Sequence, residues 1–146
     1  MADAERKRLT PEQKQQLLDF LNASPFYRYM GMEALDSEDG QSHFRLAISD
    51  NHKNLYGILH GGVIATILDS TCSIAVASLL EPGEFSYTLD QRINYIGNTR
   101  GGVLYGRGKT LHKGRKTAVS EGEIRDEEGS LIEVGMNTLY LFRNEE

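Results

Sequence analysis

The chain has 146 residues, of which 39% are hydrophobic and 25% charged, a composition typical of one compact globular domain. Its formal net charge of -5 argues against nucleic acid as the main partner, because phosphate binding needs a basic surface. The single cysteine, Cys72, excludes an intrachain disulfide and a cysteine-based metal site. A buried, small apolar residue is a better interpretation of Cys72 than a catalytic thiol.

No targeting or membrane segment is expected. The first ten residues are charged and lack the apolar region of a secretory signal. The most apolar stretch, residues 61–80, is interrupted by Asp69 and by several serines and threonines, so it does not read as a membrane span. We therefore expect a cytoplasmic protein with no membrane partner.

Two short helices are expected near the start of the chain. Thr10 can cap the first helix, Pro11 suits its first position, and Gln13 completes a capping box. A second short turn is expected over residues 26–30, and Gly31 can end it.

A β-hairpin is expected next. Residues 32–37 form its first strand, and residues 38–40, Glu-Asp-Gly, give a turn signal. Phe44, Leu46 and Ile48 then alternate with more polar residues, as a half-buried strand requires.

The longest helical segment is expected over about residues 61–79, after a loop at 51–59. Its apolar residues lie almost all round, which predicts a helix buried on every side. Four strands are expected after it, at residues 85–96, 103–112, 117–125 and 131–142. Consecutive strands joined by short turns imply an antiparallel sheet. One such sheet wrapped around one helix is an α+β domain.

Asp69 is the most informative residue for function, because it lies in the middle of this apolar helix. A buried carboxylate without partners is costly, so it needs hydrogen bonds or a chemical role. Asp69 is therefore either a structural residue, bonded to hydroxyls such as those of Thr66 or Ser73 or facing solvent in a subunit groove, or a catalytic carboxylate.

His60, Gly61 and Gly62 stand at the start of the same helix. Glycine lets the backbone approach a ligand closely, and the free N–H groups of a helix start can stabilise an oxyanion. A helix start capped by histidine explains the same residues. Asp69 lies about 12 Å further along the helix, at ~1.5 Å per residue, which is too far to share one carbonyl. If both features belong to one site, two copies of the chain must form it.

Residues 54–62, Asn-Leu-Tyr-Gly-Ile-Leu-His-Gly-Gly, followed by Asp69, resemble the hot-dog thioesterases of the phenylacetate-degradation (PaaI-like) type. Asn54 stands six residues before His60, two glycines follow the histidine, and Asp69 stands nine residues after it. The resemblance covers roughly residues 26–142, including the strand order and the central helix.

The resemblance implies an acyl-CoA thioesterase, which hydrolyses an acyl-S-CoA thioester to a carboxylic acid and free CoA. Gly61 would supply a backbone N–H for the oxyanion, and His60 and Asn54 would help to position the thioester and the water. Asp69 of the neighbouring subunit would act as general base or nucleophile. Thr88 stands where these enzymes often carry a serine or threonine that helps to hold the water.

A basic turn at residues 113–116 is a candidate contact for the phosphates of coenzyme A, a role that comparable turns have in the family. A solvated hairpin tip explains it equally well. The candidate substrate-binding residues are Lys113, Gly114, Arg115 and Lys116 of this turn, together with Gly62. Coenzyme A enters as part of the substrate, and the resemblance implies no other cofactor and no metal.

The domain organisation that follows is an N-terminal helical extension over residues 1–24 and one hot-dog thioesterase domain over 25–146. The resemblance also implies a homo-oligomer, either a dimer joined through edge strands or a dimer of dimers, which is a homotetramer. Two other functions remain open: a non-enzymatic acyl-CoA-binding module and a hot-dog enoyl-CoA hydratase or dehydratase. The acyl group can be aromatic, short aliphatic or medium-chain.

Overall fold

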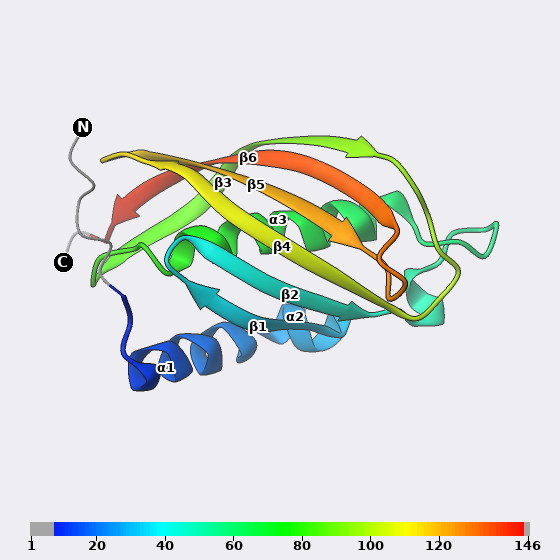
Figure 1. Ribbon diagram of the computed structural model, residues 1–146, viewed down its shortest axis with the longest axis horizontal. Coiled ribbons are helices and arrows are strands. Elements are labelled where there is room, and N and C mark those ends of the chain that lie inside the picture. The colour runs from blue at the N-terminus through cyan, green and yellow to red at the C-terminus, as the bar shows by residue number, and fades with distance from the viewer. Residues whose placement is uncertain (1–7, 145–146) are drawn as a thin grey trace.

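The computed structural model describes residues 8–144 of the chain. A single antiparallel sheet curves around one long helix, and two shorter helices lie outside one edge of that sheet (Figure 1). In chain order the elements are α1 (Pro11–Asn22), α2 (Pro25–Met30), β1 (Met32–Glu38), β2 (Gln41–Ala47), the 3-10 turn η1 (Asp50–His52), α3 (Gly61–Ala77), β3 (Glu84–Tyr95), β4 (Val103–Lys113), β5 (Thr117–Arg125) and β6 (Leu131–Arg143). The strand order is β1-β2-β4-β5-β6-β3, which places β1 and β3 at the edges. The α+β class and the hot-dog arrangement expected from the sequence are confirmed.

The two outer helices have the expected caps. The amide of Gln13 donates to Oγ1 of Thr10 at 3.1 Å, and the amide of Thr10 donates to Oε1 of Gln13 at 3.0 Å. Ser24 caps α2, and Gly31 ends it in the left-handed conformation with φ 69°. These local bonds fix where α1 and α2 begin and end.

The hairpin of β1 and β2 turns through Asp39 and Gly40. Both residues have positive φ, 49° and 74°, as a two-residue turn of the primed type requires. Glu38 and Gln41 pair directly across that turn. Ile48, expected in the second strand, lies just outside β2.

The centre of the sheet lies very close to α3. A Cβ on Gly108 of β4 would come within 2.5 Å of the Thr71 carbonyl oxygen, and one on Gly122 of β5 would come within 2.9 Å of Leu68. The missing side chains let the helix sink into the concave face. Ile64, Ile67, Leu68 and Ile74 of α3 are consequently buried in the core.

The expectation that α3 is buried on every side is wrong. Thr66, Asp69, Ser73 and Ala77 are only partly buried, and at spacings of three and four residues they share one face of the helix. We call these four residues the open stripe. Within a single chain the middle of this stripe lies between α2 and β3, which leave it partly uncovered.

The remaining boundaries agree with the sequence-based prediction to within two residues. The segment expected to be a plain loop, residues 51–59, includes part of η1 and an isolated bridge between Lys53 and Leu59. Within residues 8–144 no helix is long and apolar enough to cross a membrane.

Candidate active site

The Asp69 carboxylate is held through one of its two oxygens. Oγ1 of Thr88 on β3 donates to Oδ1 at 2.7 Å, and Nδ2 of Asn137 on β6 donates to the same oxygen at 2.8 Å. Oδ2 accepts no hydrogen bond from any described residue. A carboxylate that is anchored in this way keeps one oxygen available for a water molecule or a substrate.

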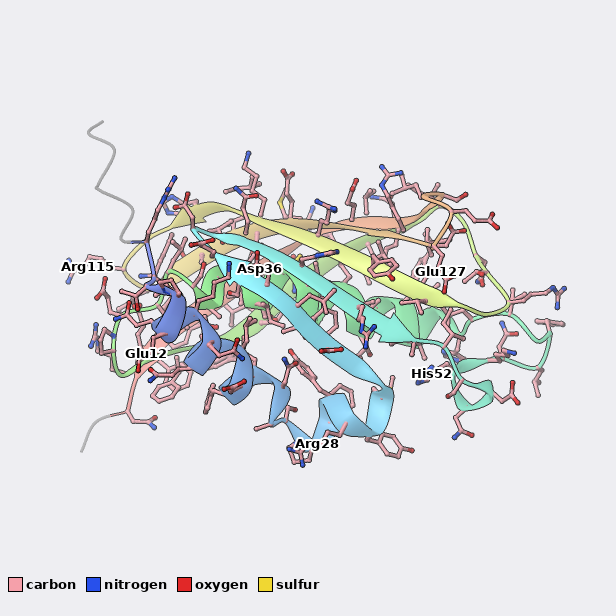
Figure 2. All side chains as sticks on the ribbon, turned by 60° about the horizontal axis from the view of Figure 1, so that its bottom comes forward. Glu12, Arg28, Asp36, His52, Arg115 and Glu127 are labelled. Atoms are coloured by element: carbon pink, nitrogen blue, oxygen red, sulfur yellow. The ribbon has the colours of Figure 1, made fainter. Side chains whose placement is uncertain are left out.

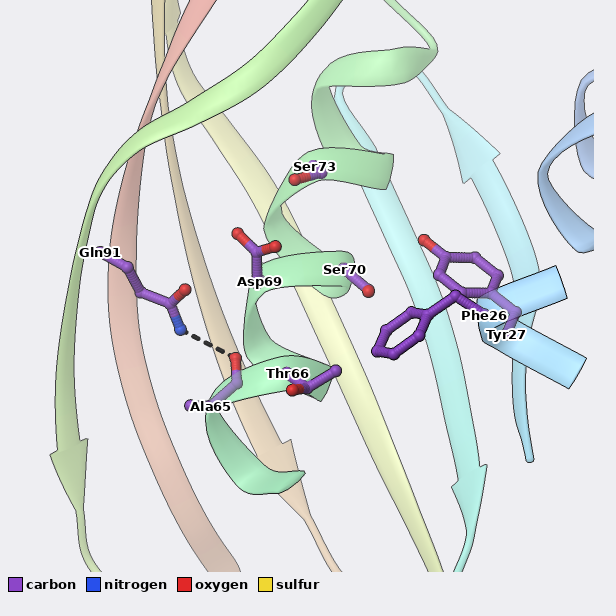
Figure 3. Close-up of a pocket in the computed structure, with 8 residues that line it drawn as sticks. All are labelled: Phe26, Tyr27, Ala65, Thr66, Asp69, Ser70, Ser73 and Gln91. Atoms are coloured by element: carbon purple, nitrogen blue, oxygen red, sulfur yellow. Dashed lines mark hydrogen bonds between the residues drawn. The ribbon is translucent and has the colours of Figure 1, made fainter. Parts of the chain in front are cut away.

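Asp69 lines a cavity of about 470 Å³ that opens along the middle of the open stripe. Phe26 and Tyr27 of α2 lie on one side of it, and Gln91 of β3 lies on the other (Figure 3). Figure 3 also shows the Gln91 amide beside the helix, where its Nε2 donates to the carbonyl oxygen of Ala65 at 2.8 Å. The size of the cavity suits a small organic ligand.

Thr66 and Ser73, the hydroxyl residues first considered as partners of Asp69, do not hold it in this chain. Oγ1 of Thr66 donates instead to the carbonyl oxygen of Gly62 at 2.8 Å. The partners of Asp69 come from strands that are distant in sequence, so the carboxylate ties α3 to β3 and β6.

His60 caps α3, and one of its ring nitrogens remains available. Its Nδ1 accepts from the amide of Gly62 at 2.8 Å. In the neutral ring the other nitrogen, Nε2, therefore carries the hydrogen. The side chain is exposed, so this N–H can donate to a ligand at the helix start.

Gly61 supplies the first N–H of α3, and that amide has no partner among the described residues. A Cβ at Gly61 would lie 3.7 Å from Tyr95, an ordinary contact, and its φ lies outside the left-handed region. No contact with a described residue of this chain therefore requires glycine at 61. Close approach by a ligand or a second protomer supplies a reason for it.

The loop before α3 is fastened by two asparagines. Oδ1 of Asn54 accepts from the amides of Tyr56 at 2.9 Å and Ile58 at 3.4 Å. Asn98 bonds both to the amide of Leu59, at 3.0 Å, and to its carbonyl oxygen, at 3.1 Å. Asn54 thus shapes the loop through its oxygen, and its Nδ2 is the group that can reach a substrate.

The predicted site residues form two separate groups. Thr88 contacts Asp69 directly. The other three predicted catalytic residues, Asn54, His60 and Gly61, lie at or before the start of α3. Because α3 is continuous, the two groups stay about 12 Å apart along its axis. We call these two groups of predicted site residues the half-sites. Within a single chain the two half-sites do not meet.

The basic turn lies at the far end of the molecule from the helix start. Figure 1 places the β4–β5 connection near the end of α3, and Figure 2 shows Arg115 and His52 at opposite ends. Nζ of Lys113 forms an ion pair with Glu84 at 3.0 Å, whereas Arg115 and Lys116 are exposed. Gly114 closes the turn, because its amide donates to the carbonyl oxygen of Thr117. Contact of this turn with phosphate stays a prediction.

Sequence reasoning missed two residues of the Asp69 cluster, Asn137 and Gln91. Asn137 is fully buried and faces the helix in the same strand phase as Leu139 and Leu141. A polar residue at an inward position of an apolar strand was therefore the available signal. Gln91 offered no comparable signal, because its strand is mostly exposed.

Cys72 is buried, and burial raises the pKa of its thiol to about 12. The thiol therefore stays protonated at neutral pH, which fits the role of a small core residue. Within residues 8–144 no cluster of three or more His, Cys, Asp or Glu side chains is arranged to hold a metal ion.

The fold and this cluster define a class: a hot-dog domain whose central helix carries a carboxylate on its open face. Residues 56–133 match the model of the thioesterase superfamily, and the chain belongs to that family. It is therefore a thioester hydrolase.

Curated relatives and solved structures agree with this membership. The chain is 27% identical to the 1,4-dihydroxy-2-naphthoyl-CoA hydrolase of Listeria monocytogenes, over 75% of this chain and 89% of that protein. It is 31% identical to a medium/long-chain acyl-CoA thioesterase of Escherichia coli, over 82% and 88% of the two chains. A thioesterase structure from Haemophilus influenzae superposes with a TM-score of 0.82 at 26% identity, covering 97% of this chain and 96% of the other.

Proposed function

We propose that the substrate is an acyl-CoA thioester, that the chain is of the PaaI-like type, and that Asp69 is the catalytic carboxylate. The observation that carries this proposal is the one-sided anchoring of Asp69. Thr88 and Asn137 hold Oδ1, Oδ2 accepts no hydrogen bond from a described residue, and the side chain lines an open cavity. A fixed carboxylate with one unbonded oxygen can accept a proton from water or attack an acyl carbon.

The second half-site completes the chemistry. Hydrolysis of a thioester needs donors for the developing oxyanion. The N–H of Gly61 and the Nε2–H of His60 are donors at a helix start that have no partner among the described residues. They lie too far from Asp69 of the same chain, so we propose that they come from a second protomer in a dimer. Nδ2 of Asn54 is a third donor from the same loop.

Membership in the thioesterase superfamily favours hydrolysis over the two other functions considered, an acyl-CoA-binding module and an enoyl-CoA hydratase or dehydratase. Two relatives carry CoA thioesters in their names, which supports coenzyme A as the thiol of the substrate. Neither name fixes the acyl group of this chain.

A thiol-release assay over a panel of acyl-CoAs tests the proposal, with Asp69→Ala and Asp69→Asn beside the wild type. Loss of a general base lowers turnover by about 100-fold or more. Wild-type rates in both variants would refute the assignment of Asp69. A parallel assay with an enoyl-CoA, in which loss of the conjugated double bond is followed, separates hydrolysis from hydration.

A further inference from the structure

A second cavity, of about 870 Å³, lies beside the Asp69 cavity on the side of the end of α3. Tyr27 and Ser73 line both cavities, so the two are adjacent. We call the second cavity the α1 groove, because one face of α1 forms its outer wall. Its apolar lining includes Leu17, Phe20 and Leu21 of α1, Ile74 and Ala77 of α3, and Leu80.

The helix that forms this wall is fixed in place. The side-chain amide of Asn22 donates to the carbonyl oxygen of Ala34 at 2.9 Å and accepts from its amide at 2.8 Å. Nζ of Lys14 bridges Asp36 at 2.8 Å and Glu38 at 3.1 Å. These contacts join both ends of α1 to β1, so the groove exists before any ligand binds, which lowers the entropic cost of binding.

The lining of the α1 groove suits an acyl chain better than the coenzyme A arm. Phe20 is 73% exposed beside the groove, so its ring is available to a ligand. At the far end the described lining includes the carboxylates of Glu81 and Glu84. Lys113 is the only lysine or arginine in this lining, and it is already paired with Glu84. The remaining carboxylate of Glu81 repels a pyrophosphate and leaves an uncharged alkyl tail unaffected.

We infer that the α1 groove is the acyl-chain site and that the preferred substrates are medium-chain acyl-CoAs. This rests on the proposed function of Asp69. From Asp69 to Ala77 the two adjacent cavities together follow α3 for about 12 Å. An extended chain advances ~3.5 Å for every three bonds, so about ten carbons span that distance. The coenzyme A portion then leaves the thioester in the opposite direction, away from the basic turn of the same protomer.

Chain-length kinetics test this inference. With acyl-CoAs from butanoyl to hexadecanoyl, kcat/KM should rise about two- to fourfold per added methylene up to about ten carbons and then level off. Leu17→Glu should lower the ratio of kcat/KM for decanoyl-CoA to kcat/KM for butanoyl-CoA about tenfold or more. Gln16→Glu, one residue away on the exposed side of α1, is the matched control and should change neither value.

A second variant keeps the test decisive if Leu17→Glu loosens α1. Ala77→Phe fills the groove from α3 and should abolish the preference for decanoyl-CoA over butanoyl-CoA. Binding of free decanoate, measured by calorimetry, should weaken about tenfold in either variant and needs no turnover.

The possible failures are distinguishable. If wild type hydrolyses no acyl-CoA, the proposed function fails. If it hydrolyses all chain lengths equally and both variants match wild type, the acyl-groove inference is overturned while the hydrolase stands. If the variants instead raise KM equally at every chain length and weaken inhibition by free CoA, the groove holds the coenzyme arm and the inference is wrong.

Discussion

Nδ2 of Asn137 on β6 donates a hydrogen bond to Oδ1 of Asp69 on α3 at 2.8 Å, although the residues are 68 positions apart in sequence. Asn137 is fully buried, and its own Oδ1 has no hydrogen-bond partner in the described part of the chain. The bond to Asp69 is therefore the main polar contact of this side chain. It fixes which oxygen of Asp69 remains available to react.

Replacing Asn137 should impair catalysis more than binding. A hydrogen bond to a charged group contributes about 1.5–3 kcal/mol, so Asn137→Leu should lower kcat about 10- to 100-fold by releasing the carboxylate from its orientation. KM should stay within about twofold, because the side chain does not line the cavity. Steady-state kinetics with one acyl-CoA measures both values.

Thr88 is the other donor to Oδ1 of Asp69, so variants of Thr88 provide a matched comparison with Asn137→Leu. Thr88→Ser keeps a hydroxyl and should retain most of kcat, whereas Thr88→Val should lose it to an extent similar to Asn137→Leu. Full activity in both Asn137→Leu and Thr88→Val would show that the orientation of Asp69 does not matter.

Gly61→Ala should separate folding from function. The added methyl has room within the chain, and alanine is the better helix former, so the free energy of unfolding should stay the same or rise by up to about 1 kcal/mol. Turnover should fall about tenfold or more, because the methyl enters the space beside the proposed oxyanion donor. Urea denaturation and the thiol-release assay measure the two effects.

Gly101→Ala is the control for that substitution, since a Cβ there meets nothing within 4 Å and an added methyl is equally free of clashes. It should leave turnover unchanged. If Gly61→Ala were as active as Gly101→Ala, close approach at the helix start would be excluded.

Two inactive variants should restore one another if the site is shared between protomers. Asp69→Ala and His60→Ala lack different half-sites, so a heterodimer has one intact site and one doubly defective site. Coexpression with random pairing should return about a quarter of the wild-type activity. Activity no higher than that of the two separate variants would place the whole site within one chain.

Glu133 should make stability fall as the pH rises. Its side chain is fully buried on β6, neither carboxyl oxygen is bonded to a described residue, and burial raises its pKa to about 8. The unfolded value is about 4.3, so folding takes up a proton between these two values. The free energy of unfolding should then drop by up to about 1.4 kcal/mol per pH unit across that window and level off above it.

Urea denaturation from about pH 5 to about pH 9, comparing wild type with Glu133→Gln, isolates this contribution. The difference in the free energy of unfolding between the two proteins should change between the unfolded and folded pKa values of Glu133. Glu121→Gln, at an exposed position of β5, should run parallel to wild type. A parallel curve for Glu133→Gln would mean that the buried carboxyl stays ionised or finds a partner.

The sequence predicted the features that depend on neighbouring residues. The reciprocal bonds of Thr10 and Gln13 and the turn at Asp39 and Gly40 are formed by residues within three positions of each other. The start of α3 at Gly61 is equally local, since His60 caps it. Short-range patterns of this kind determine element boundaries without knowledge of the tertiary structure.

The features that depend on strand order were less accessible. Asn137 reaches Asp69 only because β6 lies between β5 and β3 in the sheet. The apolar residues of α3 also hid its open stripe, although Thr66, Asp69 and Ser73 already show helical spacing. The spacing of the polar residues in that helix, considered separately from the apolar ones, predicts a partly exposed face.

The two hydrogen bonds between the Asn22 side chain and the backbone of Ala34 have a further consequence for self-association. A side-chain amide occupies the backbone donor and acceptor that a neighbouring strand would use, and α1 and α2 pack along the same outer strand. At the opposite border of the sheet, β3 has no strand beyond it among the described residues. Backbone pairing is therefore favoured at the β3 border only. Two copies joined there would leave no free border for a third, an arrangement that disfavours open-ended polymers.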